Sequence, residues 1–485
     1  MNLDFESNRP ELLHTLEDVI RIFMPGVKFA SINASAKLRI HVESNEDIQV
    51  LAQLINNNCL EEKIREGYHQ DEEPDNQVRR LVRLAVYQLL LKKTGGPGSP
   101  WGVLTGVRPT KIVHRWLDQG RTLEEVERNL IHRYTLAEEK ARLLVQVARV
   151  QRPFLLSISS LKPVSIYMGI PFCPTRCVYC SFAGEPINRA GALVPAYLSA
   201  LREEIASVRQ LIAEFNLHVQ AVYLGGGTPT CLSESDFDGL LTFIRESIPW
   251  AGVREFTVEA GRPDTLDKTK FQIMKESGVT RVSINPQTMH QETLDLIGRK
   301  HSVEEIIEKY YQAIEMKFDI NMDLILGLPG ETPDHVESTM EQMAKLKPDN
   351  LTVHTLALKR NSVINRERGT FRLANSKDAE EMLEISRKKA REMGMYPYYL
   401  YRQKNILGQL ENTGYCFPGK ECLYNISIME ERQTIIGLGV GAGSKFVNSQ
   451  GQLEDAVYNP KDIIYYLKQL NLLTKKKIDK LVSIV

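Results

Sequence analysis

The period of the hydrophobic pattern changes near residue 160. Before that point, apolar residues recur mainly three and four positions apart, as they do on one face of a helix. This spacing predicts helices at Glu11–Phe23, Gln77–Lys93, Thr110–Leu117, Leu123–His132 and Ala137–Val150. An alternating stretch at Lys37–Val42 predicts a strand, and the glycines and prolines of Thr94–Pro100 predict a loop. Residues 1–160 are therefore expected to form an α+β domain, and we assign no role to it.

From about Pro163, short β-branched runs alternate with amphipathic segments. This rhythm is typical of repeated strand–helix units in an α/β protein with a parallel sheet. It predicts six strands, at Val164–Met168, Val219–Leu224, Glu255–Ala260, Thr280–Asn285, Asn321–Leu326 and Leu351–Leu356. Helices are expected between them, for example at Leu193–Ile212, Ser235–Glu246 and Val303–Met316. Six units favour a partial (β/α)6 barrel over residues 161–360, with its chemistry at the carboxyl ends of the strands.

Beyond residue 360 the pattern is first helical, at Ala379–Glu392, and then irregular and rich in Tyr and Gly through Tyr396–Ser444. Residues 361–485 are therefore expected to form a third, mainly α domain. The lysine run Lys475–Lys477 is interpreted as a solvated face.

The composition narrows the class of protein. Lys+Arg and Asp+Glu are equal at 61 each, so net charge gives no reason to expect a nucleic-acid partner. Met1–Pro10 is acidic and polar, and no run approaches the roughly 20 apolar residues of a membrane span. We therefore expect a cytoplasmic protein without a membrane span. Three of the seven cysteines crowd into one short segment, which favours metal binding over disulfides.

These cysteines, Cys173, Cys177 and Cys180, follow the first predicted barrel strand with the spacing C-x3-C-x2-C. Three thiolates on one loop can bind three irons of a [4Fe–4S] cluster and leave the fourth iron open. The open iron can chelate the amino and carboxylate groups of S-adenosylmethionine (SAM) and pass an electron to its sulfonium. A zinc site would require a fourth close Cys or His, and neither type occurs from Ser181 to Asn216. The motif therefore favours a cluster over zinc.

Four further predicted strands end in glycines or polar residues. The second ends in Gly225-Gly226-Gly227-Thr228, where the missing Cβ atoms allow a ligand to approach the backbone. Glu259, Gln287 and Asp323 lie on or just beyond the next three strands. A polar side chain inside a barrel loses hydration unless it finds a partner, which is either another barrel residue or a ligand.

Taken in order, these motifs resemble the oxygen-independent coproporphyrinogen III oxidase family of radical SAM proteins, and within it the HemZ-like subgroup. The resemblance covers about Val164 to Phe446. It implies one [4Fe–4S] cluster on Cys173, Cys177 and Cys180, with SAM as the second cofactor. The resemblance also implies roles for single residues: Tyr167 near the sulfonium, Gly226, Gly227 and Thr228 at the methionine moiety, Glu259 at the amino group, and Gln287, Arg299 and Asp323 at the ribose and carboxylate.

The resembled enzyme converts two propionates of coproporphyrinogen III into vinyl groups, giving protoporphyrinogen IX. The resemblance implies this substrate and an electron donor such as a flavodoxin or ferredoxin. Propionates call for basic side chains, and the candidates are Arg262, Arg360, Arg402 and Lys404. Tyr398–Asn405 and Gly437–Gly443 resemble the C-terminal domain that covers the barrel opening in this family.

The chain departs from the family pattern at several points. Gly169 stands where many relatives have His, and the N-terminal arm associated with a second SAM has no match in residues 1–160. Cys59, Cys231, Cys416 and Cys422 are interpreted as ordinary thiols, with an auxiliary site at Cys416 and Cys422 as the alternative.

Three other functions stay open. Relatives with the same cysteine motif are heme-trafficking proteins, which would bind heme and leave coproporphyrinogen unchanged. A radical SAM enzyme that opens or methylates heme would consume it. A further alternative is RNA binding by the N-terminal domain.

Overall fold

The computed structural model describes residues 2–156, 163–182, 184–367 and 369–484. The chain packs as two compact units, Met1–Ala148 and Arg149–Val485. The sequence analysis expected three domains, with boundaries near residues 160 and 360. Residues beyond 360 extend the sheet of the larger unit, so they pack with the barrel strands. The division into three domains stays a prediction.

The smaller unit is an α+β fold, as expected. Its sheet has the order β2-β1-β3-β4-β5, and the strands are β1 Asn2–Ser7, β2 Lys28–Phe29, β3 Ala36–Ser44, β4 Asp47–Ile55 and β5 Cys59–Gly67. The five predicted helices are present as α1 Leu13–Phe23, α2 Pro74–Thr94, α3 Thr110–Asp118, α4 Leu123–Tyr134 and α5 Glu138–Leu156. Buried side chains alternate along β3 and β4, so one face of this sheet packs against the core and the other faces solvent.

The larger unit is built on an eleven-stranded sheet with the order β14-β15-β13-β12-β11-β10-β9-β6-β16-β17-β18. The six predicted barrel strands are confirmed as β6 Pro163–Ile170, β9 His218–Gly226, β10 Glu255–Glu259, β11 Arg281–Ser283, β12 Asp319–Leu326 and β13 Asn350–Thr355. They run parallel to one another. A seventh parallel strand, β16 Thr434–Gly439, pairs with β6.

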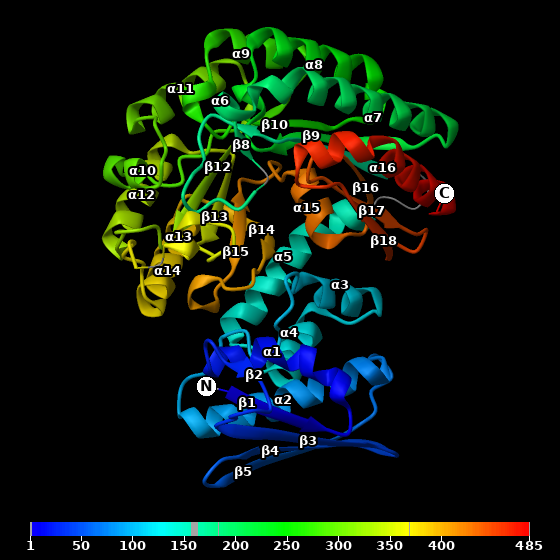
Figure 1. Ribbon diagram of the computed structural model, residues 1–485, viewed down its shortest axis with the longest axis vertical. Helices are drawn as coiled ribbons and strands as arrows, with labels where there is room; N and C mark the ends of the chain where they lie inside the picture. Colours follow the sequence, from blue (N-terminus) through cyan, green and yellow to red (C-terminus); the bar gives the residue numbers. More distant parts are fainter. Residues whose placement is uncertain (1, 157–162, 183, 368, 485) are drawn as a thin grey trace. The chain divides into compact units, whose positions relative to one another are not determined.

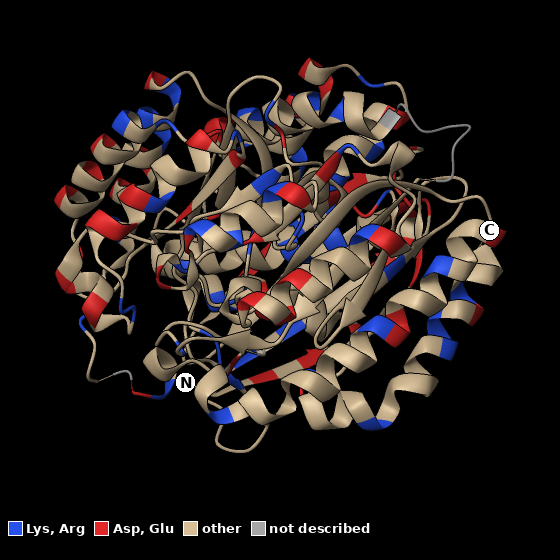
Figure 2. Ribbon diagram, turned by 90° about the horizontal axis from the view of Figure 1, so that it is seen from above, with Lys and Arg blue, Asp and Glu red and all other residues tan. Residues whose placement is uncertain are grey.

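Helices cover the outer side of this curved sheet (Figure 1). The predicted helices appear as α7 Val194–Glu214, α8 Glu234–Ser247, α11 Val303–Glu315 and α14 Ser376–Glu392. The connections also contain α6 Ile187–Ala190, α9 Lys268–Glu276, α10 Gln291–Leu296, α12 Pro333–Leu346 and α13 Val363–Arg366. Acidic and basic side chains are interspersed over these helices (Figure 2), as the balanced composition suggests.

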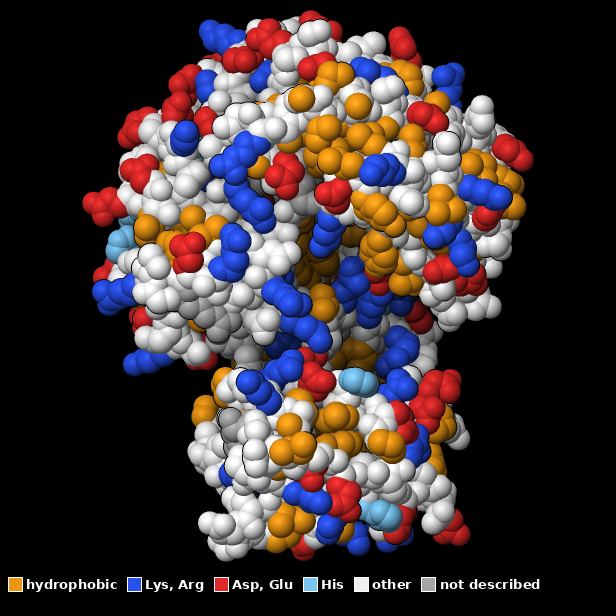
Figure 3. All heavy atoms as spheres, in the orientation of Figure 1, with side chains coloured by type: hydrophobic (Ala, Val, Ile, Leu, Met, Phe, Trp, Pro, Cys, Tyr) orange, Lys and Arg blue, Asp and Glu red, His pale blue; other side chains and the backbone are white. Residues whose placement is uncertain are grey.

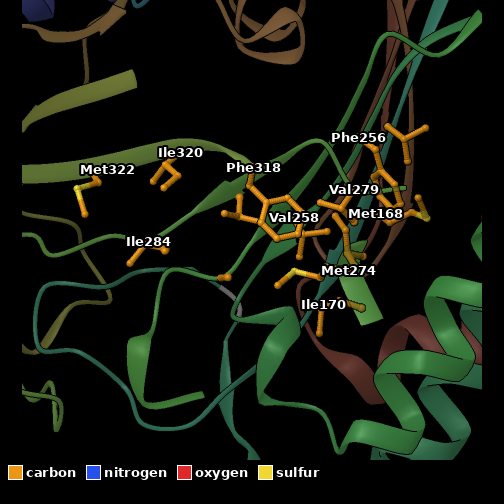
Figure 4. Packing of buried hydrophobic residues seen from close by; sticks show 14 of the residues in the cluster. Met168, Ile170, Phe256, Val258, Met274, Val279, Ile284, Phe318, Ile320 and Met322 are labelled. Atoms are coloured by element: carbon orange, nitrogen blue, oxygen red, sulfur yellow. The ribbon is translucent and has the colours of Figure 1, made fainter. Parts of the chain in front are cut away.

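The core lies between the sheet and its helices. Successive strand residues point to opposite faces. In β6, Val164, Ile166, Met168 and Ile170 pack in the apolar cluster that includes the buried face of α7, while Tyr167 belongs to the barrel interior. Figure 4 shows this outward layer, with Met168 and Ile170 beside side chains of β10. The alternation leaves the inward positions free to carry polar chemistry.

The C-terminal region differs from the expectation of a mainly α domain. Besides α14, α15 Leu423–Glu430 and α16 Ile463–Ile484, it supplies β14 Tyr396–Tyr401, β15 Asn412–Cys416, β16, β17 Gly443–Val447 and β18 Leu453–Tyr458. These strands extend both edges of the barrel sheet. Tyrosine favours strands, as in β14, and pairing of β16 with β6 and of β15 with β13 outweighs the weak strand propensity of the glycines.

The lysine run also differs from its prediction. Lys477 is 3% exposed and pairs with Glu204 of α7, a carboxylate that also accepts hydrogen bonds from Tyr466 and from the Gly439 amide. Only Lys475 and Lys476 form the solvated face. The buried pair therefore ties α16 and the end of β16 to α7.

Candidate active site

A cavity of about 390 Å³ lies at the carboxyl ends of the parallel strands, a size typical of ligand pockets. All eleven site residues predicted from the sequence line it: Tyr167, Cys173, Cys177, Cys180, Gly226, Gly227, Thr228, Glu259, Gln287, Arg299 and Asp323. The parallel topology brings them together, because the carboxyl ends of neighbouring strands meet at one edge.

The three cysteines lie on the loop that follows β6. Cys177 is buried and the other two are half-buried, and none forms a disulfide. Burial raises the pKa of the Cys173 thiol to about 11, although the Thr228 hydroxyl lies 3.8 Å from its sulfur and opposes the shift. Bound iron would favour the thiolate instead, as metal coordination generally does. Three thiols on one loop fit the ligand set of a cluster with one open iron.

No set of three or more His, Cys, Asp or Glu side chains converges on a single-ion site in the part of the chain that the structure describes. Cys416 and Cys422 are fully buried, and the Cys422 thiol donates to Glu255 at 3.2 Å. The interpretation of these two as ordinary buried thiols fits this packing.

A buried arginine holds the cysteine loop. The Arg262 guanidinium makes two bonds of 3.0 and 2.9 Å to the Asp264 carboxylate. It also donates to the Thr175 hydroxyl at 3.0 Å and lies 3.8 Å from the Cys177 sulfur. Behind this pair, His301 Nδ1 lies 3.4 Å from Asp264. Arg262 lines the cavity but is 3% exposed, and its guanidinium is held by protein partners, so its role as a propionate ligand stays a prediction.

The glycine-rich strand end packs against protein as well as facing the cavity. A Cβ on Gly225 would lie 2.7 Å from the Glu259 carboxyl carbon, and one on Gly227 would lie 2.9 Å from the Ile170 carbonyl oxygen. The amides of Gly227 and Thr228 each donate at 2.7 Å to main-chain carbonyls beside the cysteine loop. Part of the glycine requirement therefore comes from close packing of strand β9 on this loop.

Glu259 has two protein partners in the cavity wall. Its carboxylate accepts from the Tyr223 hydroxyl at 2.7 Å and from the Gly226 amide at 3.0 Å. Burial nevertheless raises the pKa of Glu259 to about 7, and the charge of Asp323 contributes. Tyr223 stacks on Tyr424 with ring centroids 4.3 Å apart, and Tyr167 stacks on both rings. This places an aromatic stack beside an easily neutralised carboxylate.

Gln287 combines a strained backbone with an unpaired polar atom. Its φ is +69°, a conformation that side-chain-bearing residues rarely adopt, and its main chain is held by hydrogen bonds of 2.9 Å to the Asp323 carbonyl and the Ile325 amide. The buried Gln287 and Asn285 side-chain oxygens have no hydrogen-bond partner among the described residues. Unsatisfied buried oxygens are costly, so both positions fit contact with a ligand.

Arg299 is 5% exposed and is held largely by the main chain. Its guanidinium donates to the carbonyl oxygens of Asn285, of Pro286 at 3.5 Å and of Gly261 at 3.1 Å. Only Nε lacks a hydrogen bond to the described residues. A carboxylate ligand would therefore find few free donors on this residue, and its predicted role stays a prediction.

Asp323 faces a polar wall that the sequence analysis missed. His354 Nε2 lies 3.8 Å from its carboxylate, and the Tyr401 hydroxyl lies 3.0 Å from His354 Nδ1. Other cavity-lining residues absent from the prediction are Tyr223, Ser283, Asn285, Asn321, Thr352, Lys359, Tyr399 and Gln403. The alternation of the strands could have predicted some of them, because Asn321, Thr352 and His354 lie at alternate strand positions that face inward.

The remaining propionate candidates do not line the cavity. Arg360 and Lys404 are exposed, whereas their neighbours Lys359 and Gln403 line it. Arg402 is buried and donates to the Gln409 carbonyl at 3.1 Å. Figure 3 shows numerous Lys and Arg side chains around the hollowed face of the larger unit. Of the two neighbours that line the cavity, only Lys359 is basic, and it lies one position before the predicted Arg360.

Within the described residues, no helix is both long and apolar enough to cross a bilayer.

Residues 167–343 match the model of the radical SAM superfamily. The chain is 41% identical over 417 residues to the Bacillus subtilis "Oxygen-independent coproporphyrinogen-III oxidase-like protein HemZ", covering 85% of this chain and 83% of that protein. It is 32% identical over 326 residues to "Heme chaperone HemW" of Lactococcus lactis, covering 66% and 77%. Among solved structures, Escherichia coli coproporphyrinogen III oxidase (HemN) is similar in fold, with a TM-score of 0.52, 23% identity and coverage of 67% and 73%.

Proposed function

Because the chain belongs to the radical SAM superfamily and, within it, to the family of oxygen-independent coproporphyrinogen III oxidase-like proteins, we propose that it decarboxylates coproporphyrinogen III. Two propionate side chains would become vinyl groups, giving protoporphyrinogen IX. The superfamily uses a [4Fe–4S] cluster and SAM. We place the reaction in the cytoplasm.

One observation carries the proposal. A single cavity combines three cysteine thiols, stacked tyrosines and buried polar oxygens that have no hydrogen-bond partner among the described residues. Thiols fit the cluster, and the unpaired oxygens of Gln287 and Asn285 fit donors on the polar groups of SAM. The cavity lies inside the barrel end, where water can be excluded from a reactive intermediate.

The residues would divide the work as follows. Cys173, Cys177 and Cys180 would hold the cluster, and the Glu259 carboxylate would accept from the SAM amino group. Gln287 and Asp323 would orient the ribose, and Tyr167 would shield the sulfonium. When bound, the cluster and SAM supply a 5′-deoxyadenosyl radical that removes one hydrogen atom from a substrate carbon.

The balance of the reaction requires partners. After hydrogen removal, each propionate loses carbon dioxide and one electron to become a vinyl group. One electron must therefore enter for each SAM cleaved, and one must leave for each vinyl formed. We propose a flavodoxin-type or ferredoxin-type donor and a separate one-electron acceptor.

A second candidate is heme trafficking. It is supported by the HemW relatives, whose printed name is heme chaperone. The HemZ relative matches a larger share of this chain at higher identity, which favours the oxidase-like reading. Heme opening or methylation is a third candidate, and no observation in the structure favours it.

The deciding experiment is an anaerobic assay of cluster-reconstituted protein with reductant, SAM and coproporphyrinogen III. The oxidase proposal expects 5′-deoxyadenosine formation that depends on substrate, together with a protoporphyrin product. Cys177→Ala is the control that should abolish both. If cluster and SAM bind, coproporphyrinogen stays intact and the protein binds one equivalent of heme, the trafficking function replaces the proposal. Loss of heme with SAM and reductant would indicate heme modification.

A further inference from the structure

Lys359 is a cavity-lining cation with no ion-pair partner among the described residues. It follows β13, is half-buried and lines the cavity. The three arginines of the lining differ from it, because Arg176 is exposed, Arg262 pairs with Asp264 and Arg299 donates to main-chain carbonyls. Burial lowers the pKa of Lys359, and the nearby charge of Lys461 lowers it further. Lys359 therefore holds a half-buried ammonium beside the cavity, with no anion paired to it among the described residues.

The surrounding backbone gives this lysine a fixed place. The Leu358 amide donates to the Asn405 carbonyl at 3.1 Å, and the Leu407 amide donates to the Leu356 carbonyl at 2.9 Å. The segment carrying Lys359 therefore runs beside the connection that carries Gln403, which also lines the cavity. The Lys359 carbonyl accepts from the Ser362 amide at 3.0 Å and from its hydroxyl at 2.8 Å, which fixes the turn into α13.

An ammonium in this position is costly without a counter-ion. Partial burial removes hydration, and a like charge nearby adds repulsion. A ligand carboxylate beside Lys359 would relieve both penalties, and its hydrogen bonds to the ammonium would be charge-assisted. A neutral ligand would relieve neither.

We propose that Lys359 is the subsite that binds a carboxylate of the substrate in this cavity. The inference deepens the proposed function and rests on it, since the substrate is expected to be a tetrapyrrole with carboxylate side chains. Lys359 acts here as a positioning residue that orients the substrate for reaction at another of its side chains.

The test is a binding measurement that requires no turnover. Cluster-loaded protein with SAM is titrated with coproporphyrin III and, separately, with its tetramethyl ester, whose carboxylates are masked. Porphyrin fluorescence reports binding. Lys359→Gln should weaken coproporphyrin III binding by about tenfold and change ester binding by less than about twofold. Lys359→Arg should restore the affinity for coproporphyrin III to within about threefold of the wild-type value.

The matched control is Lys388→Gln, an exposed lysine on α14 whose ammonium lies 3.9 Å from Glu392. It should leave both affinities unchanged. Equal binding of coproporphyrin III by wild type and Lys359→Gln would overturn the subsite, as would equal weakening of acid and ester. The two proposals fail separately: selective loss of acid binding in a protein that leaves coproporphyrinogen unreacted would support the subsite and reject the decarboxylation.

Discussion

Replacing Arg262 by Gln should damage the cysteine loop without touching a cysteine. The guanidinium is 3% exposed and makes a two-bond pair with Asp264, and it reaches Thr175 and Cys177 on the loop. Burial raises the pKa of Asp264, but hydrogen bonds from His301 and Arg262 outweigh it, so the carboxyl titrates well below its usual range. In the variant this carboxylate, whose side chain is 20% exposed, keeps His301 beside it but loses its main partner.

The magnitude follows from that loss. Breaking a fully buried ion pair by removing one partner typically costs about 3–5 kcal/mol, because an uncompensated charge is left behind. The Asp264 side chain is 20% exposed and keeps His301 beside it, so solvent reduces the expected cost to about 1–3 kcal/mol. We expect Arg262→Gln to lower the free energy of unfolding of the larger unit by about this amount. Replacing both partners, as in Arg262→Leu with Asp264→Leu, should cost less, since no buried charge remains. Arg262→Lys should fall between, because an ammonium cannot reproduce the planar two-bond contact.

The assay separates stability from cluster binding. In a background with Trp101→Phe and Trp116→Phe, Trp250 is the single tryptophan and reports urea unfolding of the larger unit. Iron content and cluster absorbance after reconstitution show how much cluster the cysteine loop binds. The reasoning is refuted if Arg262→Gln costs less than about 1 kcal/mol and binds as much iron as the parent, or if the double variant is the less stable one.

Further predictions concern other parts of the larger unit. Glu259→Gln should weaken SAM binding about tenfold or more, because the ionised carboxylate is the expected acceptor for the SAM amino group. The pKa of Glu259 is about 7, so the wild-type affinity for SAM should rise between pH 6 and 8 and that of Glu259→Gln should not, as calorimetry at several pH values can check. Without SAM the same raised pKa predicts that wild type loses stability as pH rises from the unfolded value near 4.5 through 7, a loss absent from Glu259→Gln in urea titrations. Gly227→Ala should reduce cluster content because its Cβ would meet the backbone before the cysteine loop, whereas Gly239→Ala on α8 meets only a flexible arginine tip and should bind iron normally. Lys477→Met should destabilise the larger unit by about 3–5 kcal/mol by stranding a buried carboxylate, while Lys476→Met should change the unfolding free energy by less than about 0.5 kcal/mol.

The barrel strands were predictable because each is a short apolar run bounded by an amphipathic segment. All six begin and end within one or two residues of their expected bounds, although β11 is only three residues long. The site residues followed, because parallel strands place their carboxyl ends together whatever the details of packing. Outside the regular strands, the hydrophobic pattern could not predict which side chains point toward the cavity. Lys359 and Arg360 are adjacent and chemically alike, yet only Lys359 lines the cavity.

Buried polar pairs were also beyond the sequence. Arg262 was expected to bind substrate because free guanidinium groups suit carboxylates, but Asp264 lies only two residues away and closes the pair. Lys477 was expected to be solvated because it lies in a run of lysines, but its partner Glu204 is far away in the chain. In both cases one ion pair decided where the side chain lies: Arg262 pairs with Asp264 in the same turn, and Lys477 pairs with Glu204 of α7.

The unexpected seventh strand explains a departure that the sequence alone left open. Gly169 stands where many relatives have His, and it pairs with Gly439 at the end of β16. A Cβ on Gly169 would lie 2.7 Å from the Val440 carbonyl oxygen, and one on Gly439 would lie 2.6 Å from the Gly169 carbonyl oxygen. The Tyr197 hydroxyl bridges the same point, donating to the Gly169 carbonyl and accepting from the Val440 amide at 3.4 Å. The C-terminal strand therefore leaves no room for a side chain at residue 169. The glycine at this position and the glycines after residue 436 allow the same close contact between two backbones beside the cysteine loop.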